Sequence, residues 1–190
     1  MKVFEHITIL LSFVYALALT HLLSRIGVLL TVRKRVNFSG LLALMMLNGI
    51  LIAFANWLSL WDFRSVREWD IASITVQFVQ AIIIFFLCSL AAPEGGREGQ
   101  IDLEAFYWEQ RPLFYSVFIA GATVAMIANV SYLKTANAVL FVRENLFALS
   151  TILPGTLALA LKARWAQWTA GISVLLLFLY FSVTFEAVLT

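Results

Sequence analysis

The chain has 190 residues, of which 62% are hydrophobic and 13% are charged, and its formal net charge is +2. A soluble domain is close to half apolar and a quarter charged, so this composition excludes a water-soluble globular protein and indicates a membrane protein. The small net charge argues against nucleic acid as a ligand. The single cysteine, Cys88, excludes a disulfide within the chain.

Six apolar stretches, each near the length that a helix needs to cross a bilayer, follow one another along the chain. Because lipid offers the backbone no hydrogen-bond partners, all of them are expected to be helices. We therefore predict an all-α fold, a polytopic membrane helix bundle with six transmembrane helices in a single membrane domain over 1–190. The predicted spans are 4–30, 39–61, 70–92, 113–133, 138–161 and 165–187.

The first span contains polar residues at depths where a membrane helix is normally apolar. His21 lies on the order of 6 Å from the predicted midplane, at a rise of about 1.5 Å per residue. Arg25 follows one turn later, toward the side of the membrane reached after this span, which we call side A; its long side chain can reach the lipid phosphates. Two interpretations of His21 stay open: a hydrogen bond to a neighbouring helix, or a proton relay in a transport path.

Amide side chains lie near the predicted midplane of the next two spans. Asn48 is in span 39–61, and Gln77 and Gln80 are three residues apart in span 70–92, so they share a helix face. With His21, and with Ser150 and Thr151 of the fifth span, they form a candidate polar path through the centre of the bundle. The alternative is hydrogen bonding between helices, which is the more common use of such groups.

The connection between the third and fourth spans is the longest. Its first part, 93–99, contains proline and glycine and predicts a flexible turn. Over 101–112, Leu103, Phe106 and Tyr107 recur at helical spacing, which predicts one short interfacial helix. A solvated turn is the alternative, since two helical turns give a weak periodic signal.

Charged residues occur inside the fifth predicted span. If this span begins near Ala138, Arg143 and Glu144 lie more than one turn inside the membrane, where charges normally pair or face water. The alternative begins the buried span at Leu146 and leaves both charges among the lipid headgroups. Counting the crossings puts an intramembrane charge cluster on the same side of the membrane, side B, comprising Glu5, His6 and Glu186.

Two further patterns concern helix packing. In the fourth span Gly121, Ala125 and Ala128 form a stripe of small residues, which predicts a close contact between helices. In the fifth span Pro154 removes a backbone donor, which predicts a kink.

The distribution of lysine and arginine predicts the orientation. Eight basic residues fall on side A and five on side B, so side A is predicted to be cytoplasmic and both termini non-cytoplasmic, in the plasma membrane of a bacterium. Those on side A are Arg25, Arg33, Lys34, Arg35, Arg97, Arg111, Lys162 and Arg164; those on side B are Lys2, Arg64, Arg67, Lys134 and Arg143.

The sequence contains no nucleotide-binding, hydrolase or metalloprotease motif. His6 and His21 are about 22 Å apart along one helix, too far to share a metal. We therefore expect no enzyme activity, no cofactor and no metal site.

Ionisable groups inside the membrane favour a small oligomeric ion channel or transporter. Its expected partners are membrane lipids, small ions and further copies of the chain. The alternative is a non-transporting membrane partner, sensor or assembly subunit in which the same groups are structural. The residues predicted to line or gate the path are His21, Asn48, Gln77, Gln80, Arg143 and Glu144.

Overall fold

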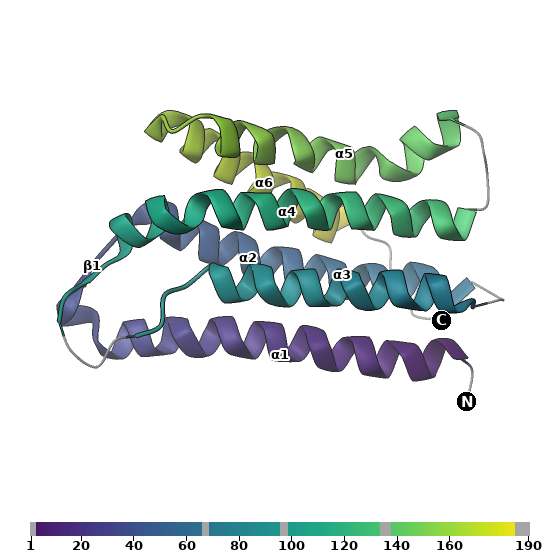
Figure 1. The fold of residues 1–190 in the computed structure, drawn as a ribbon, viewed down its shortest axis with the longest axis horizontal. Helices are drawn as coiled ribbons and strands as arrows, with labels where there is room; N and C mark the ends of the chain where they lie inside the picture. Colours follow the sequence, from purple (N-terminus) through teal and green to yellow (C-terminus); the bar gives the residue numbers. More distant parts are fainter. Residues whose placement is uncertain (1–2, 66–68, 96–98, 134–137, 185–190) are drawn as a thin grey trace.

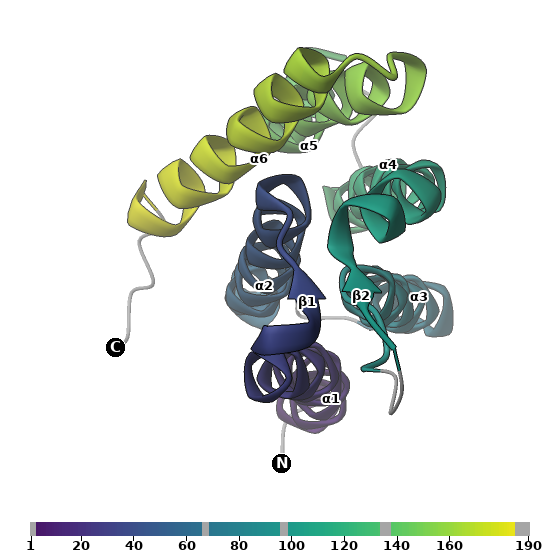
Figure 2. The same ribbon diagram turned by 90° about the vertical axis from the view of Figure 1, so that its left-hand side faces the viewer.

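A computed structural model describes residues 3–65, 69–95, 99–133 and 138–184. Helices dominate these residues and run alternately in opposite directions, with α6 inclined across α5 and α2 (Figures 1 and 2). This confirms the predicted all-α bundle. The helices are α1 (Val3–Thr31), α2 (Gly40–Ser59), α3 (Ile71–Leu90), α4 (Leu103–Leu133), α5 (Ala138–Ala160) and α6 (Arg164–Thr184).

Five helical segments in the described part of the chain are long and apolar enough to cross a membrane. They are Phe4–Thr31, Gly40–Arg64, Ile71–Leu90, Leu103–Asn129 and Arg164–Thr184, while α5 contributes the shorter apolar stretch Asn145–Ala160. Large apolar side chains cover the outside of the bundle, and Ile71 and Val183 are 83% and 84% exposed. So extensive an apolar exterior fits a multi-pass integral membrane protein.

The predicted interfacial segment 101–112 differs from the structure. Instead of a separate helix, its residues from Leu103 onward form the start of α4, which continues through Pro112 without a break. Leu103, Tyr107 and Arg111, four residues apart, are buried on one side of this helix. The predicted spacing does produce one buried helix face, but this face packs against protein rather than lying on lipid.

A short parallel strand pair joins the two loops at side A. After the 3-10 turn η1 (Arg33–Arg35), strand β1 (Val36–Asn37) pairs with β2 (Ile101–Asp102), in the register Val36 to Ile101 and Asn37 to Asp102. β2 leads directly into α4 and β1 is two residues before α2, so α2 and α4 begin close together (Figure 2). Neither strand was predicted, because two residues carry no periodic signal.

Side chains from these loops cap both helices. Ser39 Oγ accepts a hydrogen bond from the Leu42 N–H at the start of α2 and donates to Glu104 Oε2 at 2.5 Å. Asp102 accepts from the backbone N–H groups of Glu104 and Ala105 at 2.9 Å. The Ala105 N–H holds the pKa of the Asp102 carboxyl below its ordinary value, because it stabilises the charged form.

Arg25 turns inward at side A instead of extending to lipid phosphates. Its Nη1 donates to the carbonyls of Ser89 and Ala92 at 2.6 and 2.7 Å, and its Nη2 lies 2.8 Å from Glu94 Oε1. These carbonyls are at the C-terminal end of α3, where the helix leaves them without backbone donors. A cation there also complements the partial negative charge of the helix end.

Arg111 binds the carbonyls at the C-terminal end of α5 in the way that Arg25 binds those of α3. Its Nη1 donates to the carbonyls of Ala158 and Leu161 at 2.6 and 3.0 Å. Gln167 Nε2 donates to the same two carbonyls, and Gln167 Oε1 accepts from the Tyr107 hydroxyl at 2.8 Å. One buried polar network thus ties α4, the end of α5 and α6 together at side A.

We expect Arg111→Met to destabilise the protein by about 1.5–3 kcal/mol, the range for hydrogen bonds to charged groups. Methionine preserves the apolar stem but leaves the carbonyls of Ala158 and Leu161 without the charged donor. The melting temperature of the purified protein in detergent measures the loss. Lys34→Met, at an exposed position in η1, is the control and should melt like the wild type. Equal melting of all three proteins would contradict the prediction.

Candidate functional site

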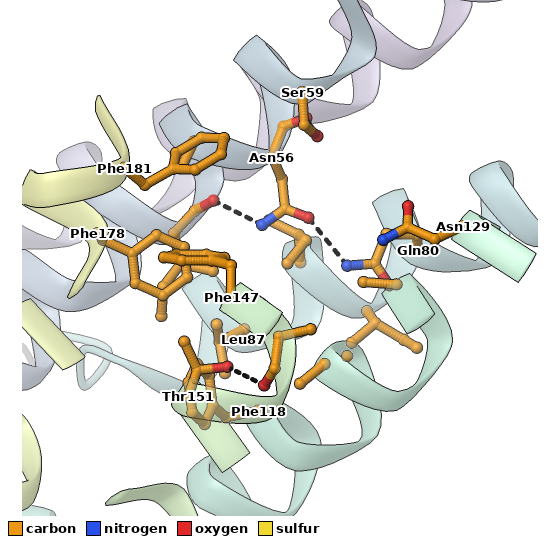
Figure 3. Close-up of a pocket in the computed structure, with 18 of the residues that line it drawn as sticks. Asn56, Ser59, Gln80, Leu87, Phe118, Asn129, Phe147, Thr151, Phe178 and Phe181 are labelled. Carbon is orange, nitrogen blue, oxygen red and sulfur yellow. Dashed lines mark hydrogen bonds between the residues drawn. The ribbon is translucent and has the colours of Figure 1, made fainter. Parts of the chain in front are cut away.

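A cavity of about 190 Å³ lies among α2, α3, α4, α5 and α6 (Figure 3). It extends from the side B end of the bundle, marked by Asp62 in the 3-10 segment η2 (Leu60–Ser65), toward the middle of the helices. Gly121 and Ala125 of the predicted small-residue stripe form part of its wall. A Cβ atom on Gly121 would lie 3.1 Å from Ile83 of α3, so the predicted close contact is present at that residue.

A chain of amide hydrogen bonds forms one wall. Asn56 Nδ2 on α2 donates to the Ile52 carbonyl of its own helix at 2.8 Å. Asn56 Oδ1 in turn accepts from Gln80 Nε2 on α3 at 2.9 Å (Figure 3). We call this chain the Asn56–Gln80 relay; it joins α2 to α3 beside the cavity.

A second amide pair joins α4 and α5 in the same way. Asn145 Nδ2 donates to the Phe141 carbonyl at 2.9 Å, and Asn145 Oδ1 accepts from Asn129 Nδ2 at 3.0 Å. Asn145 is fully buried, whereas Asn129 lines the cavity. In each pair one asparagine bonds the carbonyl four residues before it, and an amide on the next helix bonds that asparagine.

Two hydroxyl groups also line the cavity. Ser59 Oγ donates to the Asn56 carbonyl and Thr151 Oγ1 to the Ala148 carbonyl, each at 2.8 Å. A hydroxyl has a single proton to donate, so both present only their oxygen lone pairs to a ligand.

Aromatic rings form much of the remaining wall. Phe147 of α5 packs on Phe178 and Phe181 of α6, with ring centroids 5.0 and 4.9 Å apart, and Phe118 of α4 also lines the cavity (Figure 3). Phe118 also contacts α5 at Gly155, where a Cβ atom would lie 2.9 Å from its ring. The cavity therefore combines a phenylalanine surface with a polar wall.

Gln80 carries the one unsatisfied group that the cavity wall shows among the described residues. Its side chain is 5% exposed, and its Oε1 has no hydrogen-bond partner. A buried acceptor without a partner is uncommon because it has lost water and gained nothing in exchange. Asn48 Oδ1, buried where α2 meets α6 and away from the cavity, is unsatisfied in the same way.

The structure does not gather the predicted path residues at this site. Gln80 lines the cavity; Gln77 is buried but does not line it. Asn48 is buried where α2 meets α6, and its Nδ2 donates to the Gly171 carbonyl at 3.0 Å. His21 lies elsewhere, half-buried, with its ring 5.8 Å from that of Phe85 on α3.

The predicted charge cluster is described only in part. Glu5 and His6 are exposed near the start of α1. Arg143 and Glu144 belong to α5, but their side chains lie outside what the structure describes, and Glu186 lies outside the described residues. Their pairing stays a prediction.

The sequence interpretation missed Asn56 and Asn129. The signal was present, because each is an amide inside an otherwise apolar helix. The predicted path uses only amides near the predicted midplane, and these two lie closer to side B.

No protein-family model matches the chain, and comparisons with curated proteins and with solved structures also found no match. The functional argument therefore depends on the geometry of the cavity.

We expect the two residues of the Asn56–Gln80 relay to be energetically coupled. Asn56→Leu should destabilise the protein by about 1–3 kcal/mol, since it leaves the buried Gln80 amide without its partner. Adding Gln80→Leu should recover part of this loss, because replacing both partners removes the unsatisfied group. Melting temperatures of the two single variants and the double variant measure the coupling. Strictly additive losses would contradict it.

Proposed function

We propose that this chain is a small membrane transport protein, for an ion or an ion-coupled solute, that holds its cargo in the cavity. The observation that carries the proposal is the cavity itself, which lies between spanning helices and combines a phenylalanine lining with the polar side chains of Asn56, Gln80 and Thr151. Concave sites with an apolar lining and a few convergent polar groups are the usual form of a small-molecule site. In transporters such sites lie within the membrane between helices.

The arrangement favours a transporter over a channel that is open in this conformation. The inner wall of the cavity contains the apolar side chains of Ile84, Leu87 and Phe118. Further toward side A, Arg25 and Arg111 bind the ends of α3 and α5. A solute that entered from side B would need these contacts to rearrange before it could leave at side A.

His21 receives a structural role in this proposal. Its contact with Phe85 is apolar, and it lies on α1, which contributes no residue to the cavity wall. The role of Arg143 and Glu144 in gating stays a prediction.

The remaining parts of the proposal come from the sequence. The excess of basic residues supports a cytoplasmic side A, so the cavity would open on the non-cytoplasmic face of the plasma membrane. A chain of this size in lipid is expected to form a homo-oligomer and to act without catalysis.

A second candidate function is a non-transporting sensor that binds a solute in the same cavity. The networks of Arg25 and Arg111 favour it, because they hold side A closed through several charged hydrogen bonds. Flux across a membrane separates the two functions.

We expect purified protein in liposomes to carry flux of protons, potassium, sodium or chloride under an imposed gradient. Ala125→Phe, which fills the cavity, should reduce that flux by at least about tenfold, since a blocked site holds no solute. Ala120→Phe, exposed on the outside of α4, is the matched control and should behave like the wild type. Absence of flux for all four ions over a range of pH and voltage would contradict transport and leave the sensor.

A further inference from the structure

We propose that the 3-10 segment η1, which we call the basic turn, binds the headgroup of an anionic phospholipid in the leaflet at side A. The basic turn consists of Arg33, Lys34 and Arg35. Binding there requires neither the cavity nor transport. Three features of the turn support it: its depth in the membrane, its ordered backbone, and cations to which the described residues offer no acidic partner.

Exposed apolar side chains on both sides of the basic turn indicate its depth. Leu30, in the last turn of α1, is 63% exposed, and Phe38, two residues before α2, is 73% exposed. In a membrane protein such side chains are stable in the hydrocarbon or at its edge, because lipid removes them from water. Only residues 31–37 separate them, so the turn has too little chain to leave the membrane surface. Its basic side chains therefore lie at the level of the lipid phosphates.

Backbone hydrogen bonds hold the basic turn in place. The Arg35 N–H donates to the Val32 carbonyl at 2.8 Å, and the Val36 N–H donates to the Arg33 carbonyl. The pairing of β1 with β2 then fixes the chain directly after the turn. Because the backbone is already ordered, binding a headgroup has only to order side chains, which lowers the entropic cost of binding.

Two cations of the basic turn lack a counter-charge from the protein. Arg33 and Lys34 are exposed, and neither has an acidic partner among the described residues. Three carboxylates at side A are already bonded elsewhere in the protein, namely Glu94, Asp102 and Glu104. A fourth, Glu109, is exposed on α4 and forms no ion pair with the turn. The negative charge that neutralises Arg33 and Lys34 must therefore come from outside the described chain.

The phosphate of an anionic lipid matches these groups. A guanidinium can donate two parallel hydrogen bonds to phosphate oxygens, and an ammonium adds a compact charge. Basic residues directly beside a membrane span attract anionic headgroups, and each contributes about fivefold in affinity. A soluble acidic protein carries the same charge, but it would have to approach a turn flanked by the lipid-embedded Leu30 and Phe38. The membrane presents its phosphates at that depth already.

Native mass spectrometry of the purified full chain in detergent tests the proposal by measuring the occupancy of added lipid. Phosphatidylglycerol is expected to bind at least about tenfold more tightly than phosphatidylcholine with the same acyl chains, because only its headgroup carries a net charge. The preference should decrease as the salt concentration is raised. Equal affinities for the two lipids, or displacement of phosphatidylglycerol by the same concentration of inorganic phosphate, would overturn the proposal. Displacement by soluble polyglutamate would overturn it in favour of an acidic protein.

Single substitutions test whether the lipid binds at the basic turn. Lys34→Gln should weaken phosphatidylglycerol binding by about fivefold, the effect of one surface charge, and Lys34→Arg should bind like the wild type. Lys162→Gln is the matched control and should also bind like the wild type. Lys162 is exposed at side A between α5 and α6, which lie across the bundle from α1 (Figure 2).

The two lysine variants separate a local site from a response to net charge. Both lysines are exposed, so neither variant should change the melting temperature in detergent without lipid. An equal loss of phosphatidylglycerol binding in Lys34→Gln and Lys162→Gln would overturn the assignment to the basic turn. Unchanged binding in Lys34→Gln would overturn it as well.

Discussion

The structure depends on one constraint, that a backbone carbonyl or N–H group within lipid must find its partner inside the protein. Helix interiors meet this requirement themselves, but their last carbonyls do not. In this chain two arginines supply the missing donors, Arg25 at the end of α3 and Arg111 at the end of α5. Each comes from a different helix, so satisfying a helix end also fixes which helices are neighbours. Charged residues are scarce in this chain, and these two are used to satisfy backbone carbonyls at helix ends.

The same constraint shapes the cavity. Asn56 and Asn145 each bond a carbonyl of the preceding helical turn, which leaves their oxygens to receive an amide from the next helix. The pairs fasten α2 to α3 and α4 to α5, and they also determine the polarity of the wall between these hairpins. Among the described residues of this wall, the side-chain oxygen of Gln80 has no hydrogen-bond partner. Asn48 Oδ1 is unsatisfied in the same way between α2 and α6, so such atoms are not confined to the cavity wall.

Element type and approximate limits were predictable because apolar stretches of membrane length admit only helices. The continuity of α4 was not, since the periodicity of Leu103 and Tyr107 is the same whether the covered face meets lipid or protein. Gln77 and Gln80 are close on one helix, yet only Gln80 lines the cavity. The difference depends on how α3 is rotated against α2 and α4, which a single helix does not specify. Arg25 was assigned to the lipid phosphates for a similar reason, because its partners are more than 60 residues away in the chain.

The strand pair at side A has a mechanical consequence. Pairing of β1 with β2, together with the hydrogen bond from Ser39 to Glu104, holds the first turns of α2 and α4 together. When two helices are held together at one end, a change in the angle between them moves each residue in proportion to its distance from that end. Any change in the angle between α2 and α4 therefore displaces these helices least at the strands and most at side B, where both line the cavity. The strand pair therefore fixes the spacing of α2 and α4 at side A, and their spacing at side B depends on helix packing alone.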